Sequence, residues 1–84
     1  MKDPSTSTKI KIIAFGILAE KLNANKITVD GIENTASLRI WLQTNYPELK
    51  EIQMSIAVNK KIVHQNISLH TGDEIALLPP FSGG

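Results

Sequence analysis

The sequence predicts a single α+β domain, in which about five strands form a sheet and one main helix packs on one of its faces. The chain has 84 residues, of which 42% are hydrophobic, and this length is enough for one domain with a small core. Strand-like and helix-like patterns follow one another in the order strand, strand, helix, hairpin, strand. Helical material segregated to one face of a sheet is an α+β architecture.

The first half of this pattern begins after a polar segment, residues 1–8, which we expect to be a disordered leader. Lys9 to Phe15 starts with alternation and then becomes apolar at every position. This predicts a central strand that is buried on both faces near its end. Gly16 to Asn25 fits either a loop or a short helical turn. Lys26 to Val29 predicts a second short strand before the Asp30-Gly31 turn.

The main helix is predicted from Asn34 or Thr35, either of which can cap it, to about Asn45. Its apolar residues lie at positions i, i+3, i+4 and i+8 and form one stripe: Leu38, Trp41, Leu42 and Tyr46. We expect this stripe, with its tryptophan, to pack on the sheet. Pro47 should end the helix.

The second half of the chain predicts a hairpin and a last strand. Met54 to Asn59 alternates, and Asn59-Lys60 is a plausible tight turn into the segment from Lys61 to His64. After another turn at Thr71-Gly72-Asp73, the segment from Glu74 to Leu78 predicts the last strand. The folded domain is therefore expected to span residues 9–78.

Composition excludes several classes of function. Nine Lys and Arg residues against eight Asp and Glu give a net charge of +1, and without a dense basic patch we expect no nucleic-acid partner. The lack of cysteine excludes disulfides, thiolate metal sites and thiol nucleophiles and fits a reducing cytoplasm. Because no apolar run reaches about 18 residues, we expect no membrane span.

Few side chains suggest catalysis or metal binding. His64 and His70 are the only histidines, too few for a zinc site without cysteine, so we expect no metal and no bound cofactor. Asp73 and Glu74 are adjacent, and adjacent strand residues point to opposite faces. Asp73 is therefore better explained as a turn former than as one of a pair of acid–base groups.

The segment after Leu78 carries the strongest functional signal. It contains no charged side chain and runs through Pro79-Pro80 to Phe81, Ser82, Gly83 and Gly84. The prolines favour an extended exit, so residues 79–84 form a tail that reaches roughly 20 Å beyond the sheet. Without Cβ atoms, the two glycines fit a narrow channel. An inert flexible tail is the alternative reading.

The main-chain carboxylate of Gly84 would be the reactive group of such a tail. It is ionised at neutral pH and is a poor electrophile as it stands. Once converted to an acyl-adenylate, it can be attacked by a sulfur donor to give a thiocarboxylate. This chemistry needs no cysteine on the carrier.

Three stretches resemble a known family: IKIIAFGILAE from Ile10 to Glu20, AVNKKIV from Ala57 to Val63, and LHTGDEIALLPPFSGG from Leu69 to Gly84. They are similar to the small subunit of molybdopterin synthase (the MoaD type), a ubiquitin-like β-grasp sulfur carrier. The resemblance spans about residues 9–84, and the helix matches in pattern more than in identity. It implies a mixed β-grasp sheet and a role in molybdenum cofactor biosynthesis.

The resemblance also implies partners and site residues. An E1-like enzyme would use ATP to adenylate Gly84, which then becomes the thiocarboxylate. The tail, from Pro80 through Phe81, Ser82 and Gly83, would enter the large synthase subunit, which holds the catalytic residues and delivers the sulfur to a pyranopterin precursor. The chain itself would be a non-catalytic subunit, and we expect a heterotetramer of two small and two large chains.

Docking in this family uses apolar residues on the exposed sheet face, which match Phe15, Ile62 and Leu78 here. Ile13 and Phe15 lie on the opposite face of their strand from Ile10 and Ile12, so one of these two pairs should remain exposed. The alternative is that Phe15 and Leu78 belong to the core. Relatives often carry aromatic residues where this chain has Leu77-Leu78.

Other functions remain open from the sequence. The chain could carry sulfur for another pathway, such as thiamine thiazole synthesis or tRNA thiolation. It could also be a protein modifier that is joined to its targets through Gly84. A ubiquitin-like adaptor with an inert tail is the third possibility.

Overall fold

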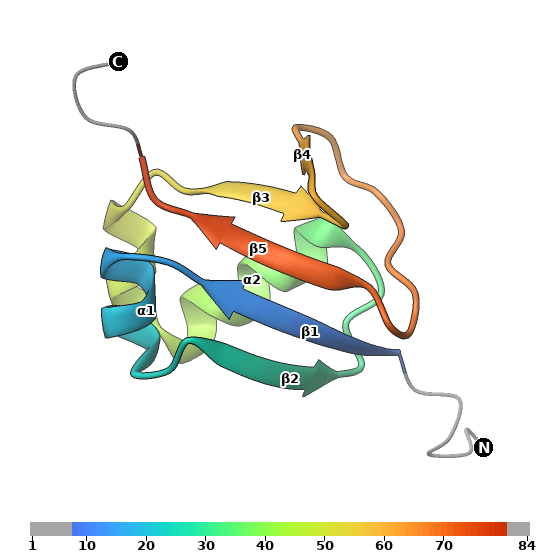
Figure 1. Cartoon of the computed structure of the whole chain (residues 1–84), viewed down its shortest axis with the longest axis horizontal. Coiled ribbons are helices and arrows are strands. Elements are labelled where there is room, and N and C mark those ends of the chain that lie inside the picture. The colour runs from blue at the N-terminus through green and yellow to red at the C-terminus, as the bar shows by residue number, and fades with distance from the viewer. Residues whose placement is uncertain (1–7, 81–84) are drawn as a thin grey trace.

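A five-stranded mixed sheet forms the body of the molecule, in a computed structural model that describes residues 8–80. The strand order is β2-β1-β5-β3-β4 (Figure 1). The central pair, β1 and β5, is parallel, and the other pairs are antiparallel. The strands are β1 (Lys9–Ala14), β2 (Lys26–Asp30), β3 (Ser55–Val58), β4 (Lys61–Val63) and β5 (Glu74–Leu78). This topology confirms the predicted β-grasp architecture.

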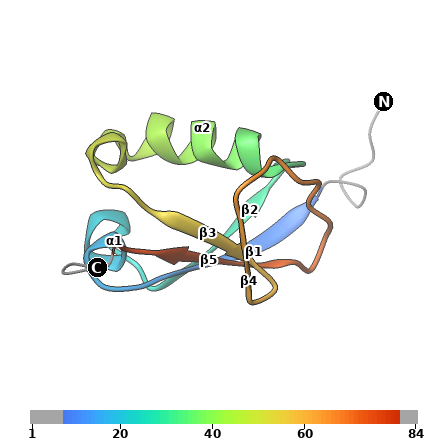
Figure 2. The ribbon, with the colours of Figure 1, turned by 90° about the horizontal axis from the view of Figure 1, so that it is seen from above.

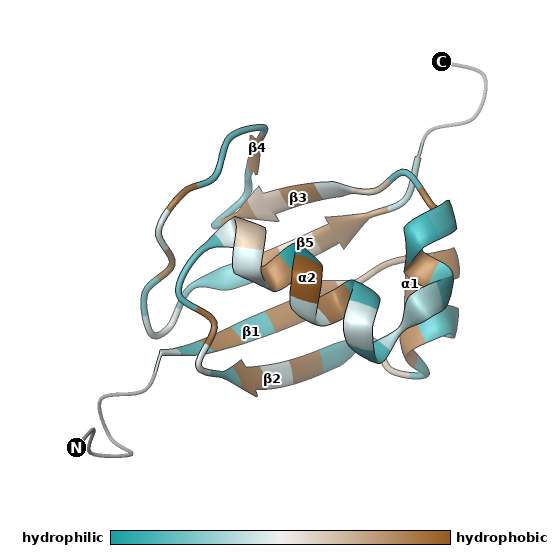
Figure 3. Ribbon diagram, turned by 180° about the vertical axis from the view of Figure 1, so that it is seen from behind, coloured by the Kyte–Doolittle hydropathy of each residue, from teal (hydrophilic) through white to brown (hydrophobic). Residues whose placement is uncertain are grey.

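One face of the sheet is covered by the main helix, α2 (Thr35–Asn45), as the view from above shows (Figure 2). Hydrophobic segments of the strands lie beneath this helix (Figure 3). The largest fully buried side chains include Ile12, Ile75 and Leu77 of the two central strands. The core therefore lies between α2 and the middle of the sheet.

Helix α2 begins and ends where its sequence predicts. The side chain of Asn34 accepts a hydrogen bond from the backbone N–H of Ser37 at 2.8 Å, so Asn34 is the cap. Leu38 and Leu42 are fully buried on the sheet side. Trp41 is only half-buried, packs at the border of the core and meets the ring of Tyr46 edge-on, with ring centroids 6.1 Å apart.

Two short helices accompany the main one. The segment whose structure the sequence left open contains α1 (Ile17–Leu22), which ends at Asn23 in a left-handed conformation. Pro47 ends α2 as expected, but it also opens a 3₁₀ helix, η2 (Pro47–Glu51), that the sequence pattern did not predict. Lys21 of α1 and Glu48 of η2 form an ion pair at 2.9 Å.

Strand β1 is buried on one face only. Ile10, Ile12 and Ala14 point into the core, whereas Ile13 is half-buried and Phe15 is 48% exposed. The expectation of burial on both faces near the end of this strand was therefore wrong. The reason is that no helix among residues 8–80 covers the second face of the sheet.

The predicted hairpin joins β3 to β4 through Asn59 and Lys60. Both residues have positive φ angles, 50° and 74°, as a two-residue type I′ turn requires. This turn sets the register in which Val58 faces Lys61 and Ala57 faces Ile62.

Replacing Leu38 with alanine should destabilise the fold by about 2–5 kcal/mol, because the side chain is fully buried between α2 and the sheet. Ile40 on the same helix is 66% exposed, so Ile40→Ala should change stability by less than about 0.5 kcal/mol. Urea unfolding followed by circular dichroism measures both. Equal losses in the two variants would contradict the placement of α2.

Candidate functional site

The face of the sheet opposite α2 carries a continuous row of apolar residues. The strand register places Ile13 opposite Ala76, Ala76 opposite Ala57, and Ala57 opposite Ile62. The row therefore crosses β1, β5, β3 and β4 on the side that Figure 1 shows in front of the helix. Directly opposed side chains on one face lie about 5 Å apart, so the row is a single surface.

Phe15 and Leu78 extend this row toward the end of the sheet. Ala14 pairs with Leu77 in the parallel ladder, so the next residue of each strand, Phe15 and Leu78, lies beside the other. Phe15 is 48% exposed, and Leu78 is half-buried. Ile62, at the other side of the row, is 50% exposed. We call the surface formed by Ile13, Phe15, Ala57, Ile62, Ala76 and Leu78 the apolar sheet patch.

The three predicted docking residues thus share one surface. Phe15, Ile62 and Leu78 all lie outside the buried core cluster, which excludes the alternative that Phe15 and Leu78 are core residues. Their role in docking stays a prediction. The sequence analysis missed Ala57 and Ala76 as members of the patch, because only the strand order reveals that these small residues form its floor.

Charged residues occupy the other end of the same sheet face. Lys11 lies opposite Glu74 in the parallel ladder, and Lys9 lies opposite Asp30 at the edge. These pairs precede the apolar row along the strands. The open face is therefore polar where β5 begins and apolar where β5 ends.

The chain leaves the sheet beside the apolar sheet patch. Strand β5 ends at Leu78, after which Pro79 is half-buried and Pro80 is exposed. Neither proline has an N–H group to continue the ladder. The other predicted tail residues, Phe81, Ser82, Gly83 and Gly84, lie outside the described residues, so their proposed role stays a prediction.

Asp73 forms the turn before β5, as the sequence predicts. Its carboxylate accepts hydrogen bonds from the Asn59 side-chain amide at 3.0 Å and from the His70 backbone N–H at 2.8 Å. These two hydrogen bonds hold the pKa of Asp73 below its usual value. Asn59 in turn accepts from the backbone N–H of Glu74 at 3.0 Å. This network ties the hairpin to the first residues of β5.

His64 and His70 are both exposed. Residues 8–80 contain no group of three or more His, Asp or Glu residues that could hold a metal ion. Between those limits, no helix is long and apolar enough to cross a membrane.

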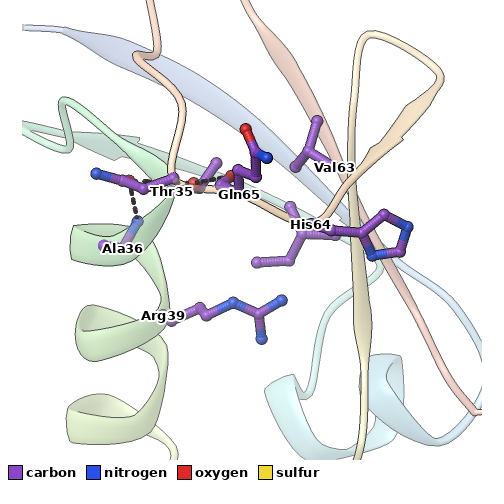
Figure 4. Close-up of a pocket in the computed structure, with 8 residues that line it drawn as sticks. Thr35, Ala36, Arg39, Val63, His64 and Gln65 are labelled. Atoms are coloured by element: carbon purple, nitrogen blue, oxygen red, sulfur yellow. Dashed lines mark hydrogen bonds between the residues drawn. The ribbon is translucent and has the colours of Figure 1, made fainter.

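A pocket of about 220 Å³ lies on the other side of the sheet, between the start of α2 and the β3–β4 hairpin (Figure 4). Its polar groups are largely engaged in holding the helix. The side-chain oxygen of Asn66 accepts from the Ala36 backbone N–H at 2.8 Å and from the Thr35 hydroxyl at 3.2 Å. Arg39 extends into the opening, but the ring of His64 points away from it. These hydrogen bonds join the start of α2 to the segment after β4.

The sequence model of the ThiS family matches residues 12–84, which is most of the chain and includes the final glycine pair. The chain belongs to the ThiS family. A human relative, the molybdopterin synthase sulfur carrier subunit, is 30% identical over 83 residues, which cover 90% of this chain and 94% of the relative.

Solved structures of similar proteins have the same fold. One chain in a solved complex of subunits 1 and 2 of molybdopterin-converting factor from Helicobacter pylori is 29% identical, with a TM-score of 0.69. The match covers 92% of this chain and all of that chain. The small archaeal modifier protein 1 from Methanosarcina acetivorans is 23% identical, with a TM-score of 0.78, over 93% of this chain and 98% of its own. The second likeness supports the fold alone.

Replacing Asp73 with asparagine should make folding less sensitive to acid. Because hydrogen bonding lowers the pKa of Asp73 in the folded state, its carboxylate stabilises the fold above the unfolded pKa of about 3.9. That contribution is lost as the pH falls through the lower, folded pKa. Urea unfolding between pH 6 and pH 2 should therefore show a smaller loss of stability in Asp73→Asn than in the wild type.

Asn59→Ala provides a companion variant, because it removes the main hydrogen bond that lowers this pKa. Its loss of stability with acid should also be smaller than that of the wild type. An unchanged pH dependence in both variants would contradict the assigned network.

Proposed function

We propose that this chain is the sulfur carrier subunit of a molybdopterin synthase and carries sulfur as a thiocarboxylate on Gly84. One structural observation carries the proposal. The apolar end of the open sheet face coincides with the point where the chain leaves β5 toward its Ser-Gly-Gly sequence. The likeness of the whole chain to the human sulfur carrier subunit supports the same function.

The proposed chemistry takes place on the main chain. The Gly84 carboxylate attacks ATP on an E1-like enzyme, which forms an acyl-adenylate and releases pyrophosphate. A sulfide-equivalent nucleophile then displaces AMP and leaves the thiocarboxylate, whose sulfur is transferred to a pyranopterin precursor. Water finally restores the carboxylate, so the carrier can be used again. In this scheme ATP is consumed by the activating enzyme and no cofactor stays bound to the carrier.

The proposed division of labour assigns the catalytic side chains to the large subunit. The body of the carrier supplies a docking surface, for which we propose the apolar sheet patch, with Phe15, Ile62 and Leu78 as its exposed contacts. The similar Helicobacter protein was solved as a complex of subunits 1 and 2 of molybdopterin-converting factor. We propose a heterotetramer of two small and two large chains, acting in the cytoplasm.

A protein modifier is the second candidate function. The chemistry of the chain end favours it, because the acyl-adenylate of Gly84 is an electrophile that a lysine amine can also attack, with release of AMP and formation of an amide bond. Both functions need adenylation, and they differ in the nucleophile that follows. The inert adaptor differs from both, because it needs no activation.

Intact mass distinguishes these possibilities. After incubation with the activating enzyme, ATP and a sulfur source, we expect the mass of the chain to rise by about 16 Da, the exchange of one oxygen for sulfur. A chain that lacks Gly84 should gain no mass, yet it should unfold at the same urea concentration as the wild type. No gain by the wild type with an enzyme of proven activity would leave the adaptor. Attachment to lysine side chains of other proteins would indicate the modifier.

Phe15→Ala should weaken binding to the large subunit by about 30-fold or more, because truncation of an aromatic residue at the centre of an interface typically costs 2 kcal/mol or more. Ile40→Ala is the matched control, since Ile40 is also an exposed apolar residue but lies on α2. It should change the affinity less than about twofold. Isothermal titration calorimetry measures both affinities. Equal affinities for the two variants would contradict docking through the apolar sheet patch.

A further inference from the structure

Gly16 and Pro79 are far apart in the sequence but lie close together at the point where the chain leaves β5. We infer that Gly16 is a positioning residue, which packs against Pro79 and sets the direction in which the chain leaves β5 toward Gly84. The inference rests on the proposed function, because the direction of the tail matters only if its end is delivered to a reaction site.

The parallel ladder brings the two residues together. Ala14 of β1 pairs with Leu77 of β5. Gly16 and Pro79 each lie two residues further along the sequence from one member of this pair. A Cβ atom built on Gly16 would lie 3.5 Å from Cγ of Pro79, and no other atom counted as a neighbour lies within 4 Å of it. This is an ordinary van der Waals distance, so the ring of Pro79 lies beside Gly16, on the side where a side chain would project.

Gly16 is connected to the core through α1. It precedes α1, and its carbonyl oxygen accepts hydrogen bonds from the backbone N–H groups of Ala19 at 3.1 Å and Glu20 at 3.3 Å. The same helix buries Leu18 completely and leaves Leu22 only 5% exposed. Gly16 is therefore fixed in position by a helix that is anchored in the core.

Pro79, the other residue of this pair, has a restricted backbone conformation. The ring of Pro79 fixes its φ angle, and Pro80 restricts the conformation of Pro79 further. Because both prolines are conformationally restricted, a rotation of the backbone at Pro79 changes the direction in which the chain continues toward Gly84. Since misplacement of reacting groups by about 1 Å can cost 100-fold in rate, a small change at the base of the tail is sufficient to impair delivery.

The backbone of Gly16 explains why a side chain is unfavourable there. Its φ is +56° and its ψ is −131°, a conformation that L-residues rarely adopt. An alanine relieves this strain by a rotation of the backbone, and that rotation moves residue 16 relative to the ring of Pro79. The effect on the tail should therefore exceed the effect of the added methyl group alone.

Two other glycines offer matched controls. Gly31 and Gly72 also have positive φ angles, +83° and +95°, and a Cβ atom at either position meets nothing within 4 Å. Both lie near the end of the sheet where β5 begins, away from Pro79. Alanine at these positions introduces comparable backbone strain without a contact to the exit of the tail.

The test compares sulfur delivery by thiocarboxylated Gly16→Ala, Gly31→Ala and Gly72→Ala with the wild type, using the large subunit and the pterin precursor. We expect all three variants to unfold at lower urea concentrations than the wild type. In Gly16→Ala, kcat should fall about 10- to 100-fold, while KM for the carrier changes less than about threefold. Both control variants should keep kcat within about twofold of the wild type. A kcat for Gly16→Ala equal to that of the controls would overturn the inference.

Pro79→Ala tests the contact from its other side, because it removes the ring and leaves Gly16 in place. We expect the same fall in kcat with a nearly unchanged KM, whereas loss of docking through Phe15 would appear mainly in KM. In the unmodified wild type, NMR should detect a nuclear Overhauser effect between the Gly16 Hα protons and the Pro79 ring protons. Its absence would overturn the inference without any sulfur chemistry.

The two proposals fail in different ways. If the wild type gains no thiocarboxylate, the proposed function is wrong, and the role of Gly16 in delivery is wrong with it. If the wild type is thiocarboxylated and delivers sulfur but Gly16→Ala does so equally well, only the inference about Gly16 is overturned.

Discussion

The parallel pairing of β1 with β5 is the constraint on which the rest of the structure depends. It places the first and last strands side by side in the centre of the sheet, with Ile12 opposite Ile75 and Ala14 opposite Leu77. All four residues are buried, and Ile12, Ile75 and Leu77 completely so. Because the two strands run in the same direction, the end of β5 emerges next to the end of β1. Phe15, Leu78 and the exit at Pro79 are neighbours for this reason alone.

The eleven residues of α2 cover only one face of this sheet, so the other face is open to water. Along the strands, this open face changes from charged to apolar. Opposite charges face each other where β5 begins, at Lys11 and Glu74, and apolar side chains gather where β5 ends. An exposed apolar surface of this kind is unfavourable in a monomer and often marks a binding surface. In the proposed complex, this surface contacts the large subunit beside the point where the tail leaves the body.

Much of the fold follows from local pattern. The alternation in β3 and the Asn59-Lys60 turn each satisfy a local rule, and both predictions are confirmed. The sequence narrows the helix cap to Asn34 or Thr35, and the structure identifies Asn34. The pattern did not reveal η2, because a 3₁₀ helix has no periodicity of its own over five residues. The membership of Ala57 and Ala76 in the patch, and the contact between Gly16 and Pro79, depend on strand order and register, which distant segments determine together. The resemblance named the residues that we expect to dock, and the sheet register showed that they share a surface.

A reactive group on the main chain, as proposed here, suits a protein with so small a core. A catalytic cavity inside the sheet would remove contacts of residues such as Leu38 or Ile75, and each such loss costs a few kcal/mol. A carboxylate beyond Pro80 removes none of them. In this proposal, different residues determine the stability of the body and the reactivity of the end, and the two parts of the chain meet at the exit, where Gly16 lies beside Pro79. This junction is where a substitution with a modest effect on folding is expected to have a large effect on delivery.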